Sequence, residues 1–307
     1  MSKAVSDVGV ESFSNKDCLS ILAPTLPGNH YFKVATVNGS QVELRHLTDN
    51  SSGVTAISFE RMDGSGAFVP LIQIPVSSNL ISYTDADVDV TEFSYTYRAR
   101  IIDSCGRPGG VSNQAQTILL RSEKDDVRLL CYLQWNPYQD WNGPVLEYRL
   151  YRGIDGVFSA TPIAFLPHDV LTYSDDLNDI TFTGKVCYYL EAAEGSNIYN
   201  DPELSKSNET CQVFEPIIYV PNAFIVTGIN NTFFPVISNF DPTEYHFTIL
   251  DRWGQTVFRS NTPGEVWDGT IQGTGKAAET ATYVYMVELR DGNGIEIIKR
   301  GHVSLLR

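Results

Sequence analysis

The feature that most constrains the fold of this chain is an internal repeat. Three sequence blocks occur twice in the same order: SYTDADVD and TYSDDLND (82–89 and 172–179), TYRARIID and CYYLEAAE (96–103 and 187–194), and VSNQAQTILL and KSNETCQVFE (from Val111 and from Lys206). The spacing between the copies is roughly 90–95 residues, which is the size of one small domain. The repeat therefore predicts two copies of one domain.

The segments within each copy have the pattern of short β-strands. Runs such as HYFKVATV and FSYTYRARII are rich in aromatic and β-branched residues, and the chain has 16 Tyr and 15 Phe beside 23 Gly and 15 Pro. Aromatic and β-branched side chains suit a half-buried pleated surface, whereas Gly and Pro favour turns. No stretch of about 12 residues shows a convincing helical period. We predict an all-β chain.

We expect three consecutive β-sandwich domains. A repeat of about 100 residues with roughly seven short strands is typical of a fibronectin-III or immunoglobulin-like sandwich. A flexible N-terminal segment (1–15) would precede two such domains at 16–121 and 122–215, and residues 216–307, which break the repeat, would form the third. In the second copy Trp135 lies in an early strand, where we expect it to be buried in the core.

Charge and hydropathy exclude some classes of partner. Lys and Arg number 22 against 37 Asp and Glu, so the net charge is −15, and −13 of it lies before residue 216. Such an acidic chain disfavours nucleic acid and anionic lipid as partners. No run of about 18 apolar residues predicts a membrane-spanning helix. Residues 1–17 lack the pattern of a signal peptide, so we expect the natural polypeptide to begin upstream.

The five cysteines do not have the spacing of a zinc site. Cys187 and Cys211 lie in the last two strand-like segments of the second copy, where a disulfide is expected, and a second bridge is expected between Cys18 and Cys105. Cys131 lies in the apolar run LLCYLQW and is predicted to be a buried free thiol. Disulfides indicate an oxidising compartment or the cell exterior, and the alternative is five reduced cysteines in the cytoplasm.

The C-terminal region carries the most specific motifs. They are Val220-Pro221-Asn222-Ala223-Phe224, Arg252-Trp253-Gly254 with Val257-Phe258, Trp267-Asp268-Gly269, Tyr283-Val284-Tyr285, and Lys299-Arg300-Gly301 with the terminal Leu305-Leu306-Arg307. Asp291–Gly294 (DGNG) is predicted to be a hairpin turn. In the strand before it, Tyr283, Tyr285, Val287 and Leu289 would share one face.

These blocks resemble the type B C-terminal domain of Bacteroidota, the gliding-motility-associated C-terminal domain. The resemblance implies export by the type IX secretion system, a requirement for the C-terminal end, and PorP/SprF-like outer-membrane proteins as partners in export or surface retention. It further implies a secreted or cell-surface protein that transits the periplasm. One departure is Ile225–Asn231, which lacks the carboxylates of the family's acidic turn.

Most motif residues are expected to serve the fold: Val220, Pro221, Asn222, Phe224, Arg252, Trp253, Gly254, Trp267, Asp268 and Gly269. Trp253 and Trp267 would be core anchors, and Gly254 and Gly269 turn glycines. The terminal strand would instead be an edge strand that offers unpaired backbone groups to a partner. The predicted recognition residues are Lys299, Arg300, Gly301, Leu305, Leu306 and Arg307.

No catalytic motif is present, and the five His are scattered, so we expect no enzyme site within the chain and no cofactor. Asp85, Asp87 and Asp89 alternate but do not fit an EF-hand; they form a loose calcium site or a solvated acidic turn. Two other functions stay open. The sandwiches could bind glycan or a surface as an adhesin, or the chain could be the export tail of an enzyme whose catalytic domain lies upstream.

Overall fold

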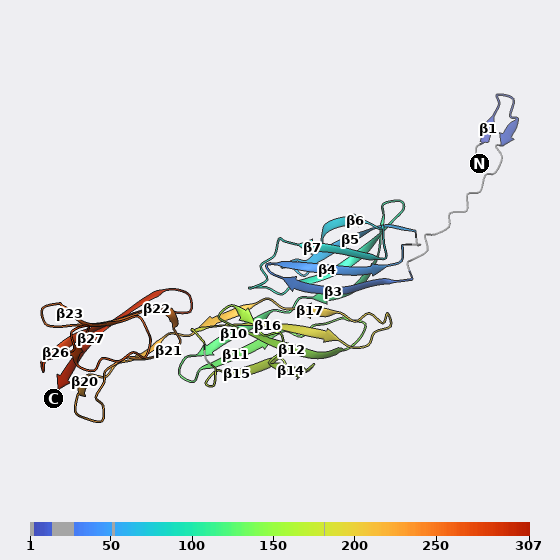
Figure 1. The fold of residues 1–307 in the computed structure, drawn as a ribbon. Coiled ribbons are helices and arrows are strands. Elements are labelled where there is room, and N and C mark those ends of the chain that lie inside the picture. Colours follow the sequence, from blue (N-terminus) through green and yellow to red (C-terminus); the bar gives the residue numbers. More distant parts are fainter. Residues whose placement is uncertain (1–2, 14–27, 51–52, 181) are drawn as a thin grey trace.

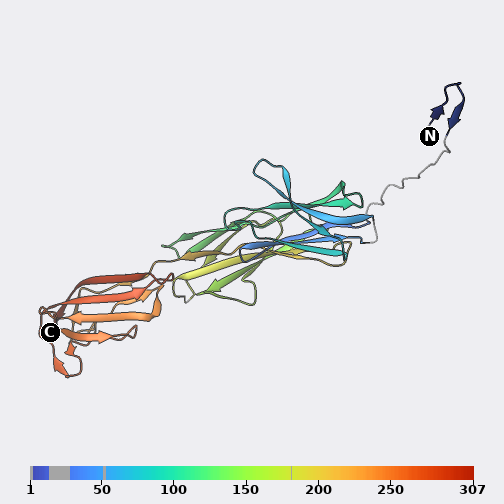
Figure 2. The ribbon, with the colours of Figure 1, turned by 90° about the horizontal axis from the view of Figure 1, so that it is seen from above.

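The computed structural model describes residues 3–13, 28–50, 53–180 and 182–307, and within these ranges all regular elements are β-strands. The chain is elongated: the first two sandwich domains lie side by side, and the third lies at one end of this pair, with the C-terminus (Figure 1 and Figure 2). The prediction of an all-β chain with three consecutive sandwiches is confirmed. None of the described residues belongs to a helix that could span a membrane.

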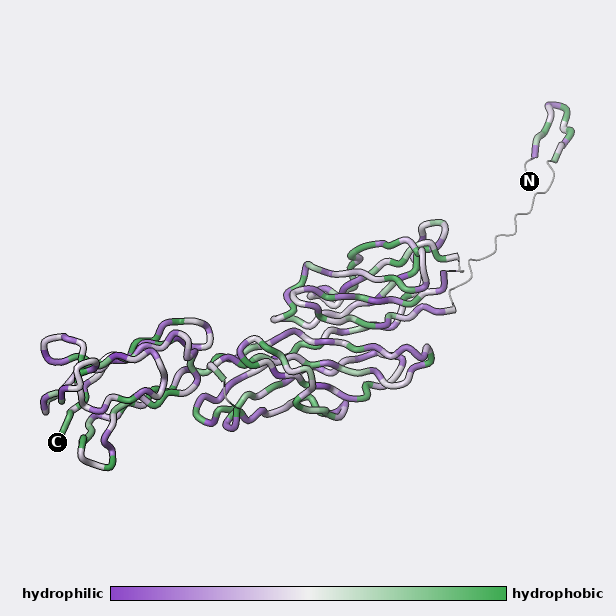
Figure 3. The backbone as a smooth tube through the Cα atoms, viewed as in Figure 1, coloured by the Kyte–Doolittle hydropathy of each residue, from purple (hydrophilic) through white to green (hydrophobic). Residues whose placement is uncertain are grey.

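The first sandwich consists of two antiparallel sheets. One has the order β3-β4-β7 (His30–Asn38, Gln41–Thr48 and Leu80–Asp85), and the other has the order β6-β5-β8-β9 (Phe68–Pro75, Val54–Met62, Thr96–Asp103 and Pro108–Gln116). Along β4 the side chains alternate, so that Val42, Leu44 and His46 are buried between the sheets. Figure 3 shows the same alternation of hydrophobic and hydrophilic residues along the strands.

The second sandwich repeats this plan. One sheet has the order β10-β11-β15 (Leu120–Asp125, Leu130–Trp135 and Thr172–Asp176). The other contains β12 (Val145–Ile154), β13 (Val157–Phe158), β14 (Ala164–Pro167), β16 (Lys185–Glu194), β17 (Leu204–Lys206) and β18 (Thr210–Val213). β10 begins at Leu120, just before the predicted boundary between residues 121 and 122. Trp135 and the Cys131 thiol are buried as predicted, and burial raises the pKa of Cys131 to about 11.

A polar trio around a buried carboxylate explains why the repeated blocks contain Asp and Tyr. In the first sandwich the Asp85 carboxylate is 2.7 Å from Nη1 of Arg61 and accepts a 3.0 Å hydrogen bond from Tyr97. The second sandwich has the same trio in Asp175, Arg152 (2.8 Å) and Tyr188 (2.8 Å). Asp85 is 1% exposed, so its charge requires these partners. The repeat in sequence thus preserves a polar network inside each sandwich.

The first and second sandwiches share one hydrophobic core and lie side by side. Backbone groups of β3 are hydrogen bonded to the second sandwich, since the Ala35 N–H donates to Tyr138 Oη (3.2 Å) and the Ala35 carbonyl accepts from Ser205 Oγ (2.8 Å). At the rim, the almost fully buried Lys33 ammonium lies 2.8 Å from the buried carboxylate of Glu203. The two domains are therefore joined by apolar, hydrogen-bonded and ionic contacts together.

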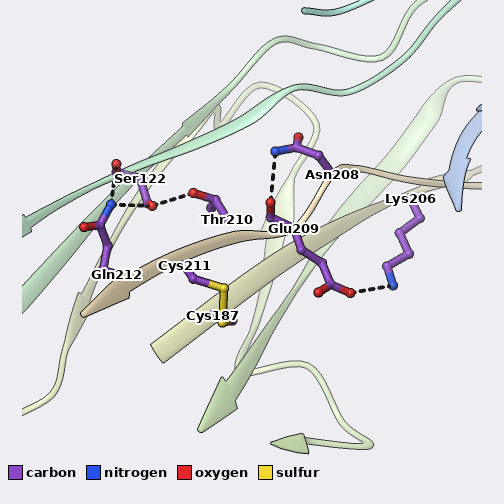
Figure 4. Close-up of a disulfide and its surroundings, with 8 residues drawn as sticks. All are labelled: Ser122, Cys187, Lys206, Asn208, Glu209, Thr210, Cys211 and Gln212. Atoms are coloured by element: carbon purple, nitrogen blue, oxygen red, sulfur yellow. Dashed lines mark hydrogen bonds and ion pairs between the residues drawn. A yellow bond between two sulfur atoms is a disulfide. The ribbon is translucent and has the colours of Figure 1, made fainter. Parts of the chain in front are cut away.

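The predicted Cys187–Cys211 disulfide is confirmed. The two residues face each other in the β16–β18 pairing, so their side chains are close without any change in the backbone. Figure 4 shows that Ser122 of β10 reaches the same strand, through Thr210 Oγ1 (2.7 Å) and Gln212 Nε2 (2.9 Å). Cys105 is exposed and has no disulfide partner among the described residues, and Cys18 lies outside them, so their pairing stays a prediction.

The third domain has a core of its own. Its main sheet has the order β20-β27-β26-β22-β23 (Ala223–Ile225, Glu296–Leu306, Thr282–Arg290, Asp241–Leu250 and Thr256–Ser260). Two short pairs cover it: β19 (Ile217–Tyr219) with β21 (Val236–Ser238), and β24 (Thr270–Ile271) with β25 (Lys276–Ala277). The predicted shared face of β26 is buried, with Tyr283, Tyr285, Val287 and Leu289 at most 7% exposed.

The segment expected to be flexible contains a hairpin that the sequence pattern did not indicate. β1 (Lys3–Val5) pairs with β2 (Glu11–Phe13), and every residue from Lys3 to Phe13 is exposed. Elsewhere the predicted turn at Asp291–Gly294 joins β26 and β27, with the Asp291 side chain accepting hydrogen bonds from the N–H groups of Asn293 (2.9 Å) and Ile295 (2.8 Å). That prediction is confirmed.

Candidate recognition surface of the C-terminal domain

The last residues of the terminal strand β27 lie inside the sheet, between β20 and β26. Ser304, Leu305 and Leu306 pair in parallel with β20, and the Ser304 N–H donates to the Asn222 carbonyl (2.9 Å). The expectation of an edge strand at the chain end is therefore wrong for these residues. The sequence could not show this, because the partner strand comes from the Val-Pro-Asn-Ala-Phe block far upstream. Among the strand pairings of this fully described domain, residues 296–303 of β27 pair with β26 alone.

The predicted recognition residues fall into two groups. Leu305 is fully buried, and Gly301 lies under the ring of Tyr285, so both serve the fold. Lys299 and Arg300 are exposed, and the Lys299 ammonium donates to the Ile218 carbonyl (2.6 Å).

The chain end continues the exposed group. Leu306 is 42% exposed, and the Arg307 guanidinium donates to the Ala278 carbonyl (2.7 Å). Arg307 thereby attaches the last residue to the loop that follows β25. Of the six predicted residues, Lys299, Arg300, Leu306 and Arg307 remain available to a partner.

The Val-Pro-Asn-Ala-Phe block places an aromatic side chain in the core. Phe224 is 3% exposed and lies against Phe233 and Trp267, with ring centroids 5.9 and 5.2 Å away. Val220 and Pro221 are half-buried, and Asn222 contributes its backbone carbonyl to the terminal strand. The block is structural, as predicted.

Trp267-Asp268-Gly269 is a turn that seals the same core. Trp267 is fully buried, and its indole N–H donates to the Thr270 carbonyl (2.8 Å). The Asp268 carboxylate accepts hydrogen bonds from the Thr270 hydroxyl and N–H, which lower the pKa of Asp268. Gly269 has φ of +82°, and a Cβ there would lie 3.1 Å from Leu305 Cδ1. The turn thus fits glycine both by conformation and by its packing against the terminal strand.

Trp253 is not a core anchor, and this prediction is wrong. Its side chain is 76% exposed at the tip of the hairpin between β22 and β23. The Asp251 carboxylate accepts hydrogen bonds from the N–H groups of Trp253 (2.8 Å) and Gln255 (2.9 Å), and Gly254 completes the turn with φ of +81°. The central residues of such a tight turn point away from the sheet, so the tryptophan faces solvent.

The exposed indole has a charged neighbour. The Arg252 guanidinium lies 5.3 Å from the Trp253 ring centroid, within cation–π range, and 3.9 Å from a carboxylate oxygen of Glu279. These contacts connect the hairpin tip to the loop between β25 and β26. Because these side chains are at the surface, the ion pair between Arg252 and Glu279 contributes little to stability.

A groove of about 320 Å³ lies beside the tip. Its apolar wall is formed by Val257, Ile271, Ala277, Ala278, Ala281 and Tyr283, and its charged rim by Asp251, Arg252, Lys276 and Glu279. Burial raises the pKa of Tyr283, whose hydroxyl donates to the Glu279 carbonyl (2.7 Å). Because Ala278 lines the groove and also accepts the hydrogen bond from Arg307, the groove adjoins the chain end. We call the Arg252–Trp253 tip, this groove and Arg307 the recognition end.

The loop that departs from the family pattern lies beside the chain end. The Val226 N–H is 3.2 Å from the Leu306 carbonyl, and Ile229 is fully exposed. Ile225–Asn231 contains no carboxylate, so the loop supplies no acidic ligand. The sequence alone indicates no role for this loop or for the groove, because both depend on segments that meet only in the folded domain.

The acidic residues that suggested calcium do not converge. Asp85 is bonded to Arg61 and Tyr97, whereas Asp87 is exposed and the Asp89 carboxylate accepts hydrogen bonds from Thr91. Among the described residues there is no group of three or more His, Cys, Asp or Glu that could hold a metal ion.

Comparisons with known proteins identify the C-terminal domain. Residues 218–305 match the family described as CHU_C Type IX secretion signal domain. A solved tetra-tandem repeat in the extending region of a large adhesion protein is 13% identical, with a TM-score of 0.34 over 99% of this chain and 80% of that chain. The FN1–FN3 domains of chicken CNTN1 are 12% identical, with a TM-score of 0.24 over 91% of this chain and 99% of that chain. No curated protein matches the sequence.

The family match spans the third domain, from the second residue of β19 to the buried Leu305 of β27. It includes the blocks on which the sequence resemblance rests, except the last two residues, Leu306 and Arg307, and the predicted secretion signal is confirmed. The signal indicates export across the outer membrane, to the cell surface or the medium, and interaction with the secretion machinery. The C-terminal domain of this chain is a type IX secretion signal domain.

Proposed function

We propose that the recognition end is the surface by which an outer-membrane component of the type IX machinery binds this protein. The observation that carries the proposal is Trp253. Its side chain is 76% exposed, whereas Trp267 of the same domain is fully buried. A tryptophan held in solvent by a well-bonded turn supports a binding role, because Trp and Arg are the residues that most often dominate interfaces. The adjoining groove would accept an apolar side chain of the partner.

The resemblance to type B domains supports a PorP/SprF-like outer-membrane protein of a Bacteroidota cell as the partner. In this proposal the chain acts by recognition and carries out no catalytic step. The bound domain is exported and then released or retained at the surface. The first two sandwiches act as a spacer, and their shared core supports this role because it restricts bending between them. A role in gliding motility is an extension of the same resemblance.

The test places residues 216–307 behind a signal peptide and a fluorescent reporter in a Bacteroidota host. The domain has its own core, which supports its use in isolation. Removal of the chain end would be a poor variant, because it deletes the buried Leu305 and would unfold the domain. Trp253→Ala is sharper, and Tyr219→Ala is its matched control, because Tyr219 is 65% exposed on β19, outside the recognition end.

We expect the parent and the Tyr219→Ala reporter to reach the surface or medium, and the Trp253→Ala reporter to stay in the periplasm in a folded form. A host without the translocon should retain all three. Normal export of Trp253→Ala would show that the recognition end is not the binding surface. The domain would still be an export signal. Periplasmic retention of the parent, with its outer-membrane partner co-expressed, would overturn the export role.

The adhesin role remains a second candidate, supported by exposed aromatic side chains on the sandwiches. Phe93 and Phe165 are each 61% exposed, on the first and second sandwich respectively. Glycan-array binding by the full chain that is lost in Phe93→Ser or Phe165→Ser would establish this role. The remaining alternative, the export tail of an enzyme, would be tested by reading the gene for a catalytic domain upstream of residue 1.

A further inference from the structure

Four hairpin turns of the described chain have the same form. In each turn the first residue is an Asp whose N–H donates to the carbonyl four residues later, and the fourth is a glycine with φ between +74° and +84° (Asp63–Gly66, Asp103–Gly106, Asp251–Gly254 and Asp291–Gly294). The second residue differs, and is Gly64, Ser104, Arg252 and Gly292 respectively. Because serine and arginine occupy this position, and Gly292 does not have a positive φ, the turn itself does not require glycine there.

Gly292 touches the backbone of the second sandwich. A Cβ at this position would lie 2.7 Å from the backbone nitrogen of Lys185 and 2.8 Å from the carbonyl carbon of Gly184. Main-chain atoms cannot rotate away as the end of a side chain can, so any larger residue would push the two segments apart. At Gly64, by contrast, no heavy atom lies within 4 Å of such a Cβ. Glycine is therefore required at residue 292 by the neighbouring domain and not by its own turn.

Gly184 receives a second segment of the C-terminal domain. It immediately precedes β16 and has φ of +108°. A Cβ there would lie 2.9 Å from the carbonyl oxygen of Asn239 and 3.3 Å from the nitrogen of Gly292. Asn239, between β21 and β22, is itself left-handed, with φ of +60°, and is 8% exposed. Two loops of the C-terminal domain therefore close on one glycine at the end of the second sandwich.

The linker between the two domains is short. Phe214 is fully buried in the core of the second sandwich, and its N–H donates to the Gly184 carbonyl (2.7 Å). β19 begins at Ile217, so only Glu215 and Pro216 connect the domains. Proline has a fixed φ and restricts the residue before it to extended conformations, so the linker allows few orientations.

The rest of the junction is not closely packed. The two domains have separate hydrophobic cores. A cavity of about 400 Å³ lies between them, lined by Asp155, Phe182 and Thr183 on one side and by Ile237, Ser238 and Phe240 on the other. Domains that share little buried surface move relative to each other by default. Their orientation here therefore depends on the linker and on the contact at Gly292, and not on a common core.

We propose that the contact of Gly292 with Gly184 and Lys185 locks the C-terminal domain to the second sandwich. With the core that the first two sandwiches share, this lock makes the three domains one rigid arm. The recognition end lies at the opposite end of the C-terminal domain, because β26 runs from Thr282, beside the chain end, to Arg290, beside the turn (Figure 1). A partner bound there would hold the sandwiches at a fixed angle, pointing away from it; this consequence rests on the proposed function, whereas the lock does not.

The test is Gly292→Ser, which introduces the residue type found at Ser104 in the same turn form. Gly64→Ser is the matched control, and a reference chain carries Gly-Ser-Gly-Ser after Glu215 as a flexible linker. Backbone amide relaxation in residues 1–307 measures a rotational correlation time for each domain. The parent and Gly64→Ser should give one common value. In Gly292→Ser the value for the C-terminal domain should fall below that of the sandwiches, toward that of the reference chain.

The isolated domain, residues 216–307, provides the second measurement. The second sandwich is absent there, so Gly292→Ser should leave its unfolding midpoint unchanged. A destabilised isolated variant would overturn the proposal, because the glycine would then serve its own turn. So would a parent whose C-terminal domain already tumbles like that of the reference chain, or a Gly292→Ser chain with one common correlation time. No translocon is present in either measurement, so a failure of the lock is distinct from a failure of the proposed function.

Discussion

The ring of Tyr285 lies across the backbone of Gly301 on the neighbouring strand. The two residues are opposite each other in the β26–β27 pairing, and a Cβ at residue 301 would be 2.8 Å from Cε1 of the tyrosine. The ring is 7% exposed and lies 6.0 Å from the Phe233 ring centroid. It therefore cannot move aside without leaving the core. The glycine of the Lys-Arg-Gly block serves the fold, although it stands among residues that a partner could contact.

Gly301→Ala should destabilise the C-terminal domain by about 1–3 kcal/mol, because the added methyl group overpacks the site against Tyr285. Urea unfolding followed by near-ultraviolet circular dichroism would measure the change in the free energy of unfolding. Gly64→Ala is the control, because no heavy atom lies within 4 Å of a Cβ built there. Equal unfolding midpoints for the Gly301 variant and the parent would show that the ring adapts at no cost.

The two tryptophans of the C-terminal domain should respond oppositely to truncation. Trp267→Ala removes a fully buried ring and should cost about 3–5 kcal/mol, whereas Trp253→Ala should change stability by no more than about 0.5 kcal/mol. Thermal unfolding of the isolated domain would measure both, with Trp267→Phe as a milder variant that keeps the domain folded. A large loss of stability in Trp253→Ala would mean that the tip supports the fold and does not merely present a side chain.

Reduction of the Cys187–Cys211 bond should destabilise the paired sandwiches by about 3 kcal/mol, as expected for a sequence separation of 24 residues. The measurement is urea unfolding of the full chain with and without dithiothreitol. The double variant Cys187→Ala/Cys211→Ala should have about the stability of the reduced parent, both with and without dithiothreitol. An identical effect of dithiothreitol on the double variant and the parent would assign the loss to another cysteine.

Stability should fall in acid through His46. Burial, and then the neighbouring His30 at 3.1 Å, lower the pKa of His46 from 6.5 to about 3. Between these values the unfolded chain binds more protons than the folded one, so the stability contributed by neutral His46 is complete above pH 6.5 and decreases as the pH falls toward 3. Between pH 7 and pH 5 the parent should lose about 2 kcal/mol more than His46→Phe. Parallel stability curves for the two chains would contradict this assignment.

The sequence by itself determined the class of the fold and the identity of the C-terminal domain. Alternating apolar residues and turn-forming glycines are local signals, and side chains that alternate along a strand must face opposite sides of a sheet. The repeat predicted the second sandwich, because the Asp85 and Asp175 networks need the same residues at the same spacing. The Cys187–Cys211 bond could be predicted for a similar reason, since neighbouring last strands bring the two residues together.

Only the tertiary structure decided which motif residues face a partner. Trp253 and Trp267 look alike in sequence, but one occupies the tip of a tight turn and the other closes the core. The last residues of the terminal strand lie inside the sheet because β20, which comes from the start of the domain in sequence, pairs with them. Such long-range pairings depend on the free energy of the whole domain, which cannot be inferred from a short stretch of sequence. For that reason the motifs identified the secretion signal, whereas its exposed surface followed only from the fold.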